Sequence, residues 1–122
     1  MNNKYSNLRQ RTKDFAVAVL ELMEGLPRGA ELGVIKRQLI RCSTSVGANY
    51  RAAQRARSRK EFVARLLVEE EADECIYWLE LLCVRRSSSK SRIQLLQGEA
   101  SELVAIFVAS RRTAIQNDSR SE

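Results

Sequence analysis

Apolar and small residues recur at alternating steps of three and four along residues 32–56, and this repeat constrains the fold more than any other feature. Its members are Leu32, Ile35, Leu39, Cys42, Val46, Asn49, Ala53 and Ala56. Because an α-helix has 3.6 residues per turn, the repeat predicts a helix with one continuous buried face. The members become smaller toward the end of the segment, which predicts that a neighbouring backbone or a bulky aromatic side chain approaches closely there.

Three further segments carry a helical pattern. Apolar residues at the same spacing predict a helix upstream, over residues 8–26. The residues 58–61 fit a capping box, so a third helix is predicted to begin there and to continue to about Cys83. A second capping box at residues 91–94 predicts the start of a fourth helix, which continues past Phe107.

The connections between these helices are short. The only proline and two of the five glycines fall in residues 25–29, and a serine cluster occupies residues 87–91. No strand-like alternation or long-period repeat is present in the sequence. The sequence therefore predicts an all-α fold, an up-down-up-down four-helix bundle, in a single domain of residues 1–115, followed by a frayed polar tail of residues 116–122.

The composition excludes several classes of function. The chain has 21 basic and 15 acidic residues, and the resulting net charge of +6 favours an anionic partner such as nucleic acid. Histidine is absent, which removes the usual general base near neutral pH, the commonest zinc ligand and every Ser/His or Cys/His nucleophile pair. We therefore expect a protein that is not an enzyme, with no catalytic residues, no cofactor and no metal.

The cysteines indicate a reducing compartment. Cys42, Cys75 and Cys83 are odd in number, form no C-x-x-C pair and lie among apolar or small residues, as is typical of reduced core thiols. No apolar run approaches the roughly 20 residues that a membrane span requires. A cytoplasmic protein with no membrane partner is the resulting expectation.

Basic residues are concentrated between Lys36 and Lys60, where the chain has eight of them and no carboxylate. A helical wheel places four arginines opposite the apolar repeat, and three more basic residues follow them; this basic stripe comprises Arg37, Arg41, Arg51, Arg55, Arg57, Arg59 and Lys60. A spacing of four residues is about 6 Å along a helix, which suits phosphate contacts, whereas the alternative is a solvated helix face. With no interleaved aromatic residue and no base-reading motif, binding of RNA or DNA would be mainly to the backbone.

The next segment, residues 61–83, is acidic, since its charged residues are seven carboxylates and the single Arg65. On a helical wheel, however, its apolar residues cover nearly all sides. Such a helix is predicted to be buried by more than its own bundle partners, as at a subunit interface. Three of the carboxylates fall inside the apolar arc, where they need basic partners from the second helix or another subunit. The candidate interface or buried polar residues are Asn49, Glu70, Glu71, Glu74, Tyr77 and Trp78.

Other interpretations of these residues are weaker. A carboxylate-bridged dimetal site in a helix bundle typically needs Glu-x-x-His motifs, and this chain has no histidine. Glu70 and Glu74 lack the nucleophile or phosphate-binding loop that would make an acid/base pair useful. The alternative to nucleic-acid binding is a protein-interaction scaffold, in which the basic and acidic helices serve subunit assembly and nucleic acid has no role.

Three ordered motifs carry a family resemblance. They are the segment from Gln38 to Tyr50, with Arg41, Ser43, Ser45 and Val46-Gly-Ala-Asn49; the segment Ser58-x-x-Glu61-Phe62; and Glu71-Ala-x-Glu74-x-x-Tyr77-Trp-Leu79. Together with Arg11-Thr-Lys-Asp14-Phe15-Ala-Val17, they resemble the four-helix-bundle proteins of the 23S ribosomal RNA intervening-sequence family. The resemblance covers about residues 8–110.

The resemblance implies a small bacterial bundle, in some relatives encoded within the segment that interrupts 23S ribosomal RNA genes. Similar bundles include the accessory variability proteins of diversity-generating retroelements, which form ring-like pentamers and engage nucleic acid and a reverse transcriptase. A homopentamer and, by distant analogy, a reverse-transcriptase partner are thus implications of the resemblance. The family usually has Glu where this chain has Ala52. If that Glu pairs with an arginine in relatives, one arginine is freed here; the alternative is an apolar contact at this position.

Overall fold

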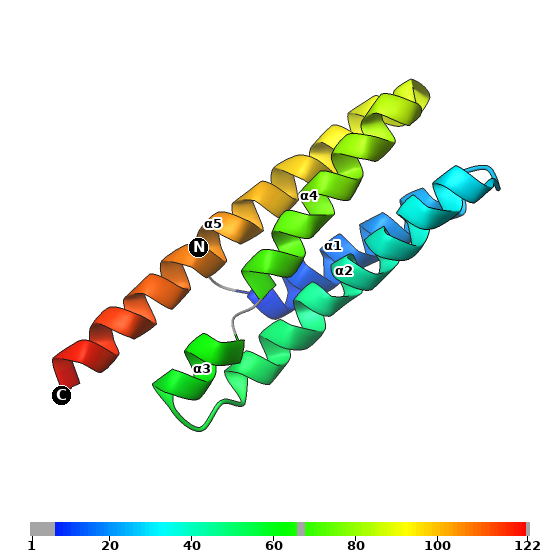
Figure 1. Ribbon diagram of the computed structural model, residues 1–122. Helices are drawn as coiled ribbons and strands as arrows, with labels where there is room; N and C mark the ends of the chain where they lie inside the picture. Colours follow the sequence, from blue (N-terminus) through cyan, green and yellow to red (C-terminus); the bar gives the residue numbers. More distant parts are fainter. Residues whose placement is uncertain (1–6, 66–67, 122) are drawn as a thin grey trace.

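The backbone is helical almost throughout the part of the chain that the computed structural model describes, residues 7–65 and 68–121 (Figure 1). In chain order the elements are α1 (Leu8–Glu24), α2 (Ala30–Gln54), α3 (Arg59–Arg65), α4 (Val68–Arg85), the 3₁₀ turn η1 (Ser87–Ser89) and α5 (Lys90–Ser121). No strand occurs in the described residues. The prediction of an all-α fold is confirmed.

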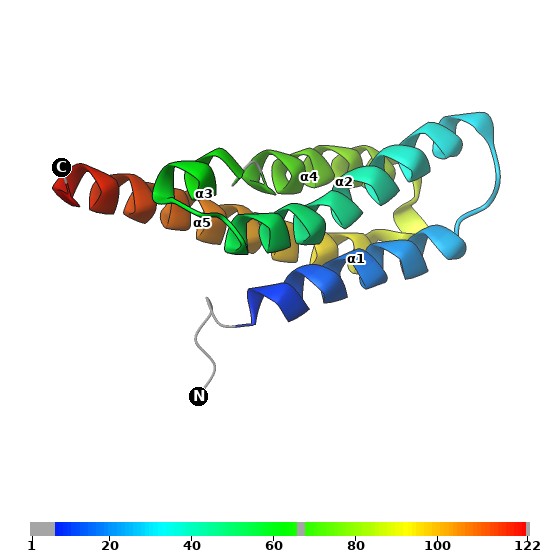
Figure 2. The ribbon, with the colours of Figure 1, turned by 90° about the horizontal axis from the view of Figure 1, so that it is seen from below.

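The four long helices α1, α2, α4 and α5 lie side by side and alternate in direction (Figures 1 and 2). Helix α2 packs against α1 and α4, and helix α5 packs against α4 and α1, which closes the bundle. The short connections explain the alternation, because a few residues are enough only to return the chain to an adjacent antiparallel helix. The predicted four-helix arrangement is confirmed.

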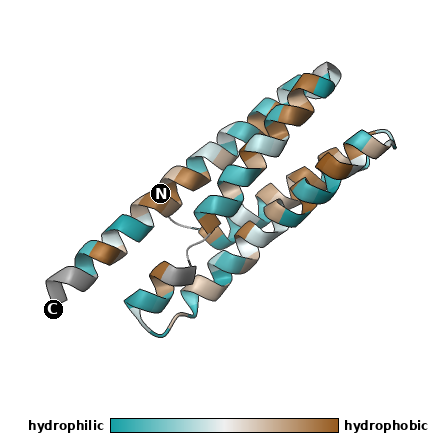
Figure 3. Cartoon of the chain, viewed as in Figure 1, coloured by the Kyte–Doolittle hydropathy of each residue, from teal (hydrophilic) through white to brown (hydrophobic). Residues whose placement is uncertain are grey.

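One apolar core holds the four long helices together. Phe15 of α1 is 2% exposed, and Leu39 of α2, Leu79 of α4 and Phe107 of α5 are completely buried. Each such burial stabilises the folded chain by about 1.5–3 kcal/mol. Polar residues share the surface of every long helix with these apolar ones, as expected for helices with one face in solvent (Figure 3).

The apolar repeat of residues 32–56 forms the buried side of α2 as far as Ala53. Asn49 is half-buried, and Ala56 lies beyond the end of α2. The predicted close approach occurs at Gly47, where an added Cβ atom would lie 3.2 Å from Thr12 Oγ1 of α1. A bulky aromatic also packs near this end, since the rings of Tyr50 and Phe107 have centroids 5.8 Å apart.

The predicted third helix corresponds to α3 and α4 in the described part of the chain. The prediction that it is continuous between them falls on residues 66 and 67, which lie outside the described residues. Helix α3 packs against α2 and the end of α5, whereas α4 packs between α2 and α5 (Figure 1). The segment looked apolar on nearly all sides because α4 also has large apolar side chains on its outer side, where Tyr77 is 53% and Leu81 37% exposed.

The predicted helix starts have different outcomes. The backbone N–H of Glu61 donates to Ser58 Oγ at 3.1 Å, and the N–H of Arg57 donates to Glu61 Oε2 at 3.3 Å, which confirms a cap before α3. The fourth helix begins near Ser91 as predicted, at Lys90, but Ser91 is already helical and η1 leads into α5, so residues 91–94 do not form its cap. Helix α5 continues to Ser121, past the residue at which the sequence predicts a frayed tail.

The cysteines are free thiols. Cys42 of α2 and Cys75 of α4 are completely buried, and Cys75 Sγ donates to Cys42 Sγ at 3.0 Å. Cys83 is half-buried. Among the helices of the described residues, none combines the length and the apolar composition needed to cross a membrane.

Candidate nucleic-acid interface

The basic stripe reaches solvent along its whole length. Its seven members, Arg37, Arg41, Arg51, Arg55, Arg57, Arg59 and Lys60, are all exposed. Five of them come from α2 or the turn after it, and two from the start of α3. The outward direction that the helical wheel predicted for these side chains agrees with the structure.

Arg41 differs from the rest of the basic stripe because it is engaged with α4. Its Nη1 atom lies 3.2 Å from Glu71 Oε2, and its Nη2 atom contacts Glu74 Oε2. The indole N–H of Trp78 also donates to Glu74 Oε2, at 3.0 Å. The basic partner predicted for these two half-buried carboxylates is therefore found within the same chain.

Glu70 does not lie among apolar side chains in the single chain, contrary to the expectation from the wheel; it is exposed. The buried side of α4 is defined by Val68, Ala72, Cys75, Leu79 and Leu82. Two residues after Val68 the helix has turned by about 200°, so Glu70 points away from the core. Tyr77 lies on the same outer side, and its side chain is 53% exposed.

A groove of about 310 Å³ runs between α1 and α2, and basic side chains border it from both helices. Its lining residues, which define the α1–α2 groove, are Arg9, Thr12, Lys13, Ala16, Thr44, Gly47, Ala48 and Arg51. The floor is low because Gly47 has no side chain and sits against the buried Thr12. Arg9, Lys13 and Arg51 at the rim are all exposed.

The positive charge of the α1–α2 groove is not neutralised locally. Within the described residues, Arg9, Lys13 and Arg51 take part in no ion pair, unlike Arg41 and Arg11. The positive charge of Arg9 also acts on the phenol of Tyr50, on the neighbouring part of α2. Burial raises the pKa of the Tyr50 phenol, while its hydrogen bond with Gln54 and the Arg9 charge act in the opposite direction.

The chemistry of the α1–α2 groove suits an anion rather than a metal or a reacting substrate. Cations on two sides of a groove are the groups that bind phosphate oxygens. The hydroxyl protons of Thr44 and Thr12 are already donated to the Ile40 and Leu8 carbonyls, so the cations alone give the groove its preference for an anion. In residues 7–65 and 68–121, no group of three or more Cys, Asp or Glu side chains is placed to hold a metal ion.

Comparison with known proteins places the chain in a family. The sequence profile of the family described as "23S rRNA-intervening sequence protein" matches residues 4–109. The chain belongs to this family. The resemblance seen in the three motifs is thereby confirmed.

A solved structure supports the same assignment. The chain is similar to a protein of unknown function from the S23 ribosomal protein family of Bacteroides thetaiotaomicron VPI-5482, with 29% identity and a TM-score of 0.77. The match covers 84% of this chain and 96% of the other. The comparison with curated proteins found no match.

For this member of the 23S rRNA-intervening sequence protein family, the wheel of α2 alone missed half of the groove. Arg9 and Lys13 belong to α1, and nothing in their local sequence says which helix they face. One signal was present, because Gly47 and Ala48 mark the place where α2 can be approached most closely. Pairing that small surface with the helix containing Thr12 would have added the two α1 cations.

Proposed function

We propose that this protein is a non-enzymatic nucleic-acid-binding bundle that contacts the phosphates of RNA or DNA through the α1–α2 groove. The observation that carries the proposal is the convergence of Arg9, Lys13 and Arg51 on one groove, with no ion pair among the described residues. Unpaired cations on a folded surface repel one another, and a polyanion relieves that repulsion while releasing its own counterions.

Three further members of the basic stripe extend this surface. Arg55 and Arg57 continue from the end of α2 into the turn, and Lys60 follows in α3. Arg41 is left with a structural role, since Glu71 and Glu74 hold its guanidinium.

The proposal fixes how binding responds to salt. Three phosphate contacts on a single strand give a slope of about −2 in log affinity against log salt concentration. Raising the salt fourfold, as from about 50 to about 200 mM, should then weaken binding by about 20-fold per protomer. Fluorescence anisotropy with mixed-sequence 20-nucleotide RNA and DNA measures this directly.

A matched pair of variants tests the groove itself. Arg51→Gln removes a groove cation, whereas Lys90→Gln removes an exposed cation at the start of α5, at the opposite end of the bundle, with the same change in net charge (Figure 1). We expect Arg51→Gln to weaken binding to all sequences about equally and to lower the salt slope by about 0.7–0.9, while Lys90→Gln has little effect. Salt-insensitive binding, or equal losses in both variants, would refute the proposal.

Self-association, up to the homopentamer that the resemblance implies, is the second candidate function, and the outer side of α4 favours it. Tyr77, Leu81 and Val84 are 53%, 37% and 83% exposed, and their spacing places them on one side of the helix. This α4 ridge of three large apolar side chains is the kind of surface that a subunit contact covers. In a scaffold without nucleic acid, this contact would be the main function.

Light scattering separates the two candidates. Leu81→Gln with Val84→Gln should convert an oligomer to a folded monomer, whereas Arg51→Gln should leave the mass unchanged. A wild-type protein that is monomeric at about 100 μM would refute self-association. An Arg51→Gln variant that dissociates, together with a wild type that binds no nucleic acid, would favour the scaffold over the nucleic-acid proposal.

A further inference from the structure

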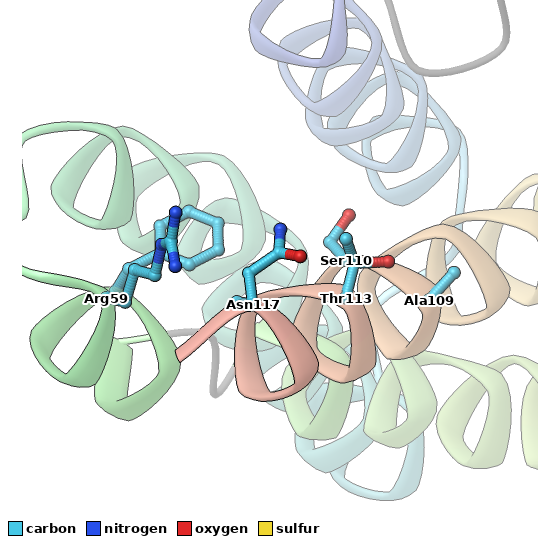
Figure 4. A pocket seen from close by; sticks show the side chains of 7 residues that line it. Arg59, Ala109, Ser110, Thr113 and Asn117 are labelled. Carbon is cyan, nitrogen blue, oxygen red and sulfur yellow. The ribbon is translucent and has the colours of Figure 1, made fainter. Parts of the chain in front are cut away.

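A second hollow lies between α3 and the last turns of α5. It has a volume of about 600 Å³, and its lining residues define the α3–α5 cleft: Arg59, Phe62, Ala109, Ser110, Thr113, Ala114 and Asn117. Figure 4 shows Ser110, Thr113 and Asn117 projecting from one side of α5, with Arg59 reaching toward the same space from α3.

The α3–α5 cleft exists because α5 extends beyond the first turn of α1 at this end of the bundle. Arg11 of α1 contacts Glu99 of α5 and lies 3.3 Å from Glu102, which fixes where the first turns of α1 meet α5. Thr113 is 14 residues beyond Glu99, about 21 Å further along α5. The described part of α1 begins at Leu8 and cannot cover that length, so this side of α5 is bordered by α3 instead.

The lining combines one flat aromatic wall with a polar edge. Phe62 is half-buried and packs against the bundle core, so its ring is held in place. Ala109 and Ala114 leave the room that larger side chains would fill. The hydroxyls of Ser110 and Thr113 can accept or donate, and the Ser110 hydroxyl donates to the Ile106 carbonyl at 2.9 Å.

The charge around the α3–α5 cleft narrows the choice of ligand. Arg59 lines the cleft. Three more basic side chains are exposed on the same elements: Arg57 in the turn before α3, Lys60 in α3 and Arg112 in α5. A ligand that suits this surface has a flat ring with polar edges and carries negative charge. A nucleotide has both properties, and a cleft of this volume is within the range of small-molecule sites.

We propose that the α3–α5 cleft takes one unpaired nucleobase of the strand whose phosphates lie in the α1–α2 groove, stacked on Phe62 beside Arg59. This inference rests on the proposed function. The cations Arg51, Arg55 and Arg57 connect the groove with the α3–α5 cleft along the end of α2. A base inside a duplex is paired and stacked, so the protein prefers single-stranded over double-stranded nucleic acid.

The test compares a normal strand with a strand of the same length made entirely of abasic sites, which keeps the phosphates and removes the bases. Stacking one base on an aromatic side chain contributes a free energy that corresponds to a loss of about five- to 150-fold in affinity when it is removed. Wild-type protein should therefore bind the normal strand about five- to 150-fold more tightly than the abasic strand or a duplex of the same sequence.

Two variants assign the effect to the α3–α5 cleft. Phe62→Leu keeps an apolar side chain and loses the flat ring, and Ala109→Leu fills the cleft without removing any core contact. Both should bind the normal strand as weakly as wild type binds the abasic strand, with unchanged duplex affinity and unchanged helical circular dichroism. Should Phe62→Leu perturb folding, Ala109→Leu decides the matter alone.

The outcomes separate this inference from the proposed function. Equal wild-type affinity for the normal and abasic strands, with salt-dependent binding still weakened in Arg51→Gln, overturns the base site and leaves the phosphate groove standing. Absence of binding to either strand overturns both.

Discussion

The contact between α1 and α2 at Gly47 offers a test of the structure that does not depend on function. Gly47→Ala should gain about 1 kcal/mol of helix propensity. The new Cβ atom would lie 3.2 Å from Thr12 Oγ1, so Thr12 would have to move by a few tenths of an ångström. Thr12 is 1% exposed, and its hydroxyl donates to the Leu8 carbonyl at 2.8 Å, a hydrogen bond with a net contribution of about 1 kcal/mol.

The two effects therefore nearly cancel in the wild-type background. We expect Gly47→Ala to change the free energy of unfolding by less than about 0.5 kcal/mol, but to stabilise a Thr12→Ala protein by about 1 kcal/mol. The coupling of about 1 kcal/mol corresponds to about 4 °C in melting temperature. Urea denaturation followed by circular dichroism, at one fixed protein concentration, measures all four proteins of the cycle.

Two controls make the result specific. Thr12→Ser keeps the hydroxyl and should preserve the coupling. Gly98→Ala adds a Cβ with no heavy atom within 4 Å, so it should stabilise by about 1 kcal/mol in every background. The close approach of α1 and α2 is refuted if Gly47→Ala stabilises the wild-type and Thr12→Ala proteins equally.

Three further predictions concern the core, a helix start and a thiol. Leu79→Ala should destabilise the protein by about 2–5 kcal/mol in urea denaturation, because Leu79 is completely buried; a loss below about 1 kcal/mol would contradict that burial. Ser58→Ala should cost about 1 kcal/mol and Ser58→Asp should restore most of it, as the cap requires. The hydrogen bond with Cys42 and burial raise the pKa of the Cys75 thiol, so the folded chain keeps its proton where the unfolded chain releases it. Stability should then fall by about 1.4 kcal/mol between about pH 7.5 and about pH 9.5, as pH passes the unfolded pKa of about 8.5, and Cys75→Val should fall less; an equal fall in both would contradict the assignment.

Periodicity was enough to predict the bundle because it depends on each helix alone. The repeat from Leu32 to Ala53 predicts which side of α2 is buried without any knowledge of the helices that pack against it. The same method misled from Phe62 to Leu82, because α4 has large apolar side chains, including Tyr77 and Leu81, on its exposed outer side as well as on its buried side. A pattern that is apolar on all sides therefore does not by itself show that all sides are buried within the single chain.

The site was predicted less completely, since it depends on which helices meet. The wheel placed Arg41 outward, and its side chain is indeed 47% exposed, yet the guanidinium reaches across to Glu71 and Glu74. Direction from the helix axis says little about where a long side chain ends. Arg9 and Lys13 were missed for the complementary reason, because a groove between two helices is a property of neither sequence segment by itself.

Because α5 extends beyond the bundle core, the free energy of local opening should differ between its first turns and its last turns. Up to Arg111, whose Nε lies 3.0 Å from Glu69 Oε1, the helix is held by the bundle core and by α4. Residues 112–117 depend on contacts with the seven-residue α3 and should open locally at a free energy well below that of global unfolding. Amide hydrogen exchange along α5 should accordingly step down after Arg111, and a ligand in the α3–α5 cleft would act as the missing packing partner, converting the fast-exchanging turns into protected ones.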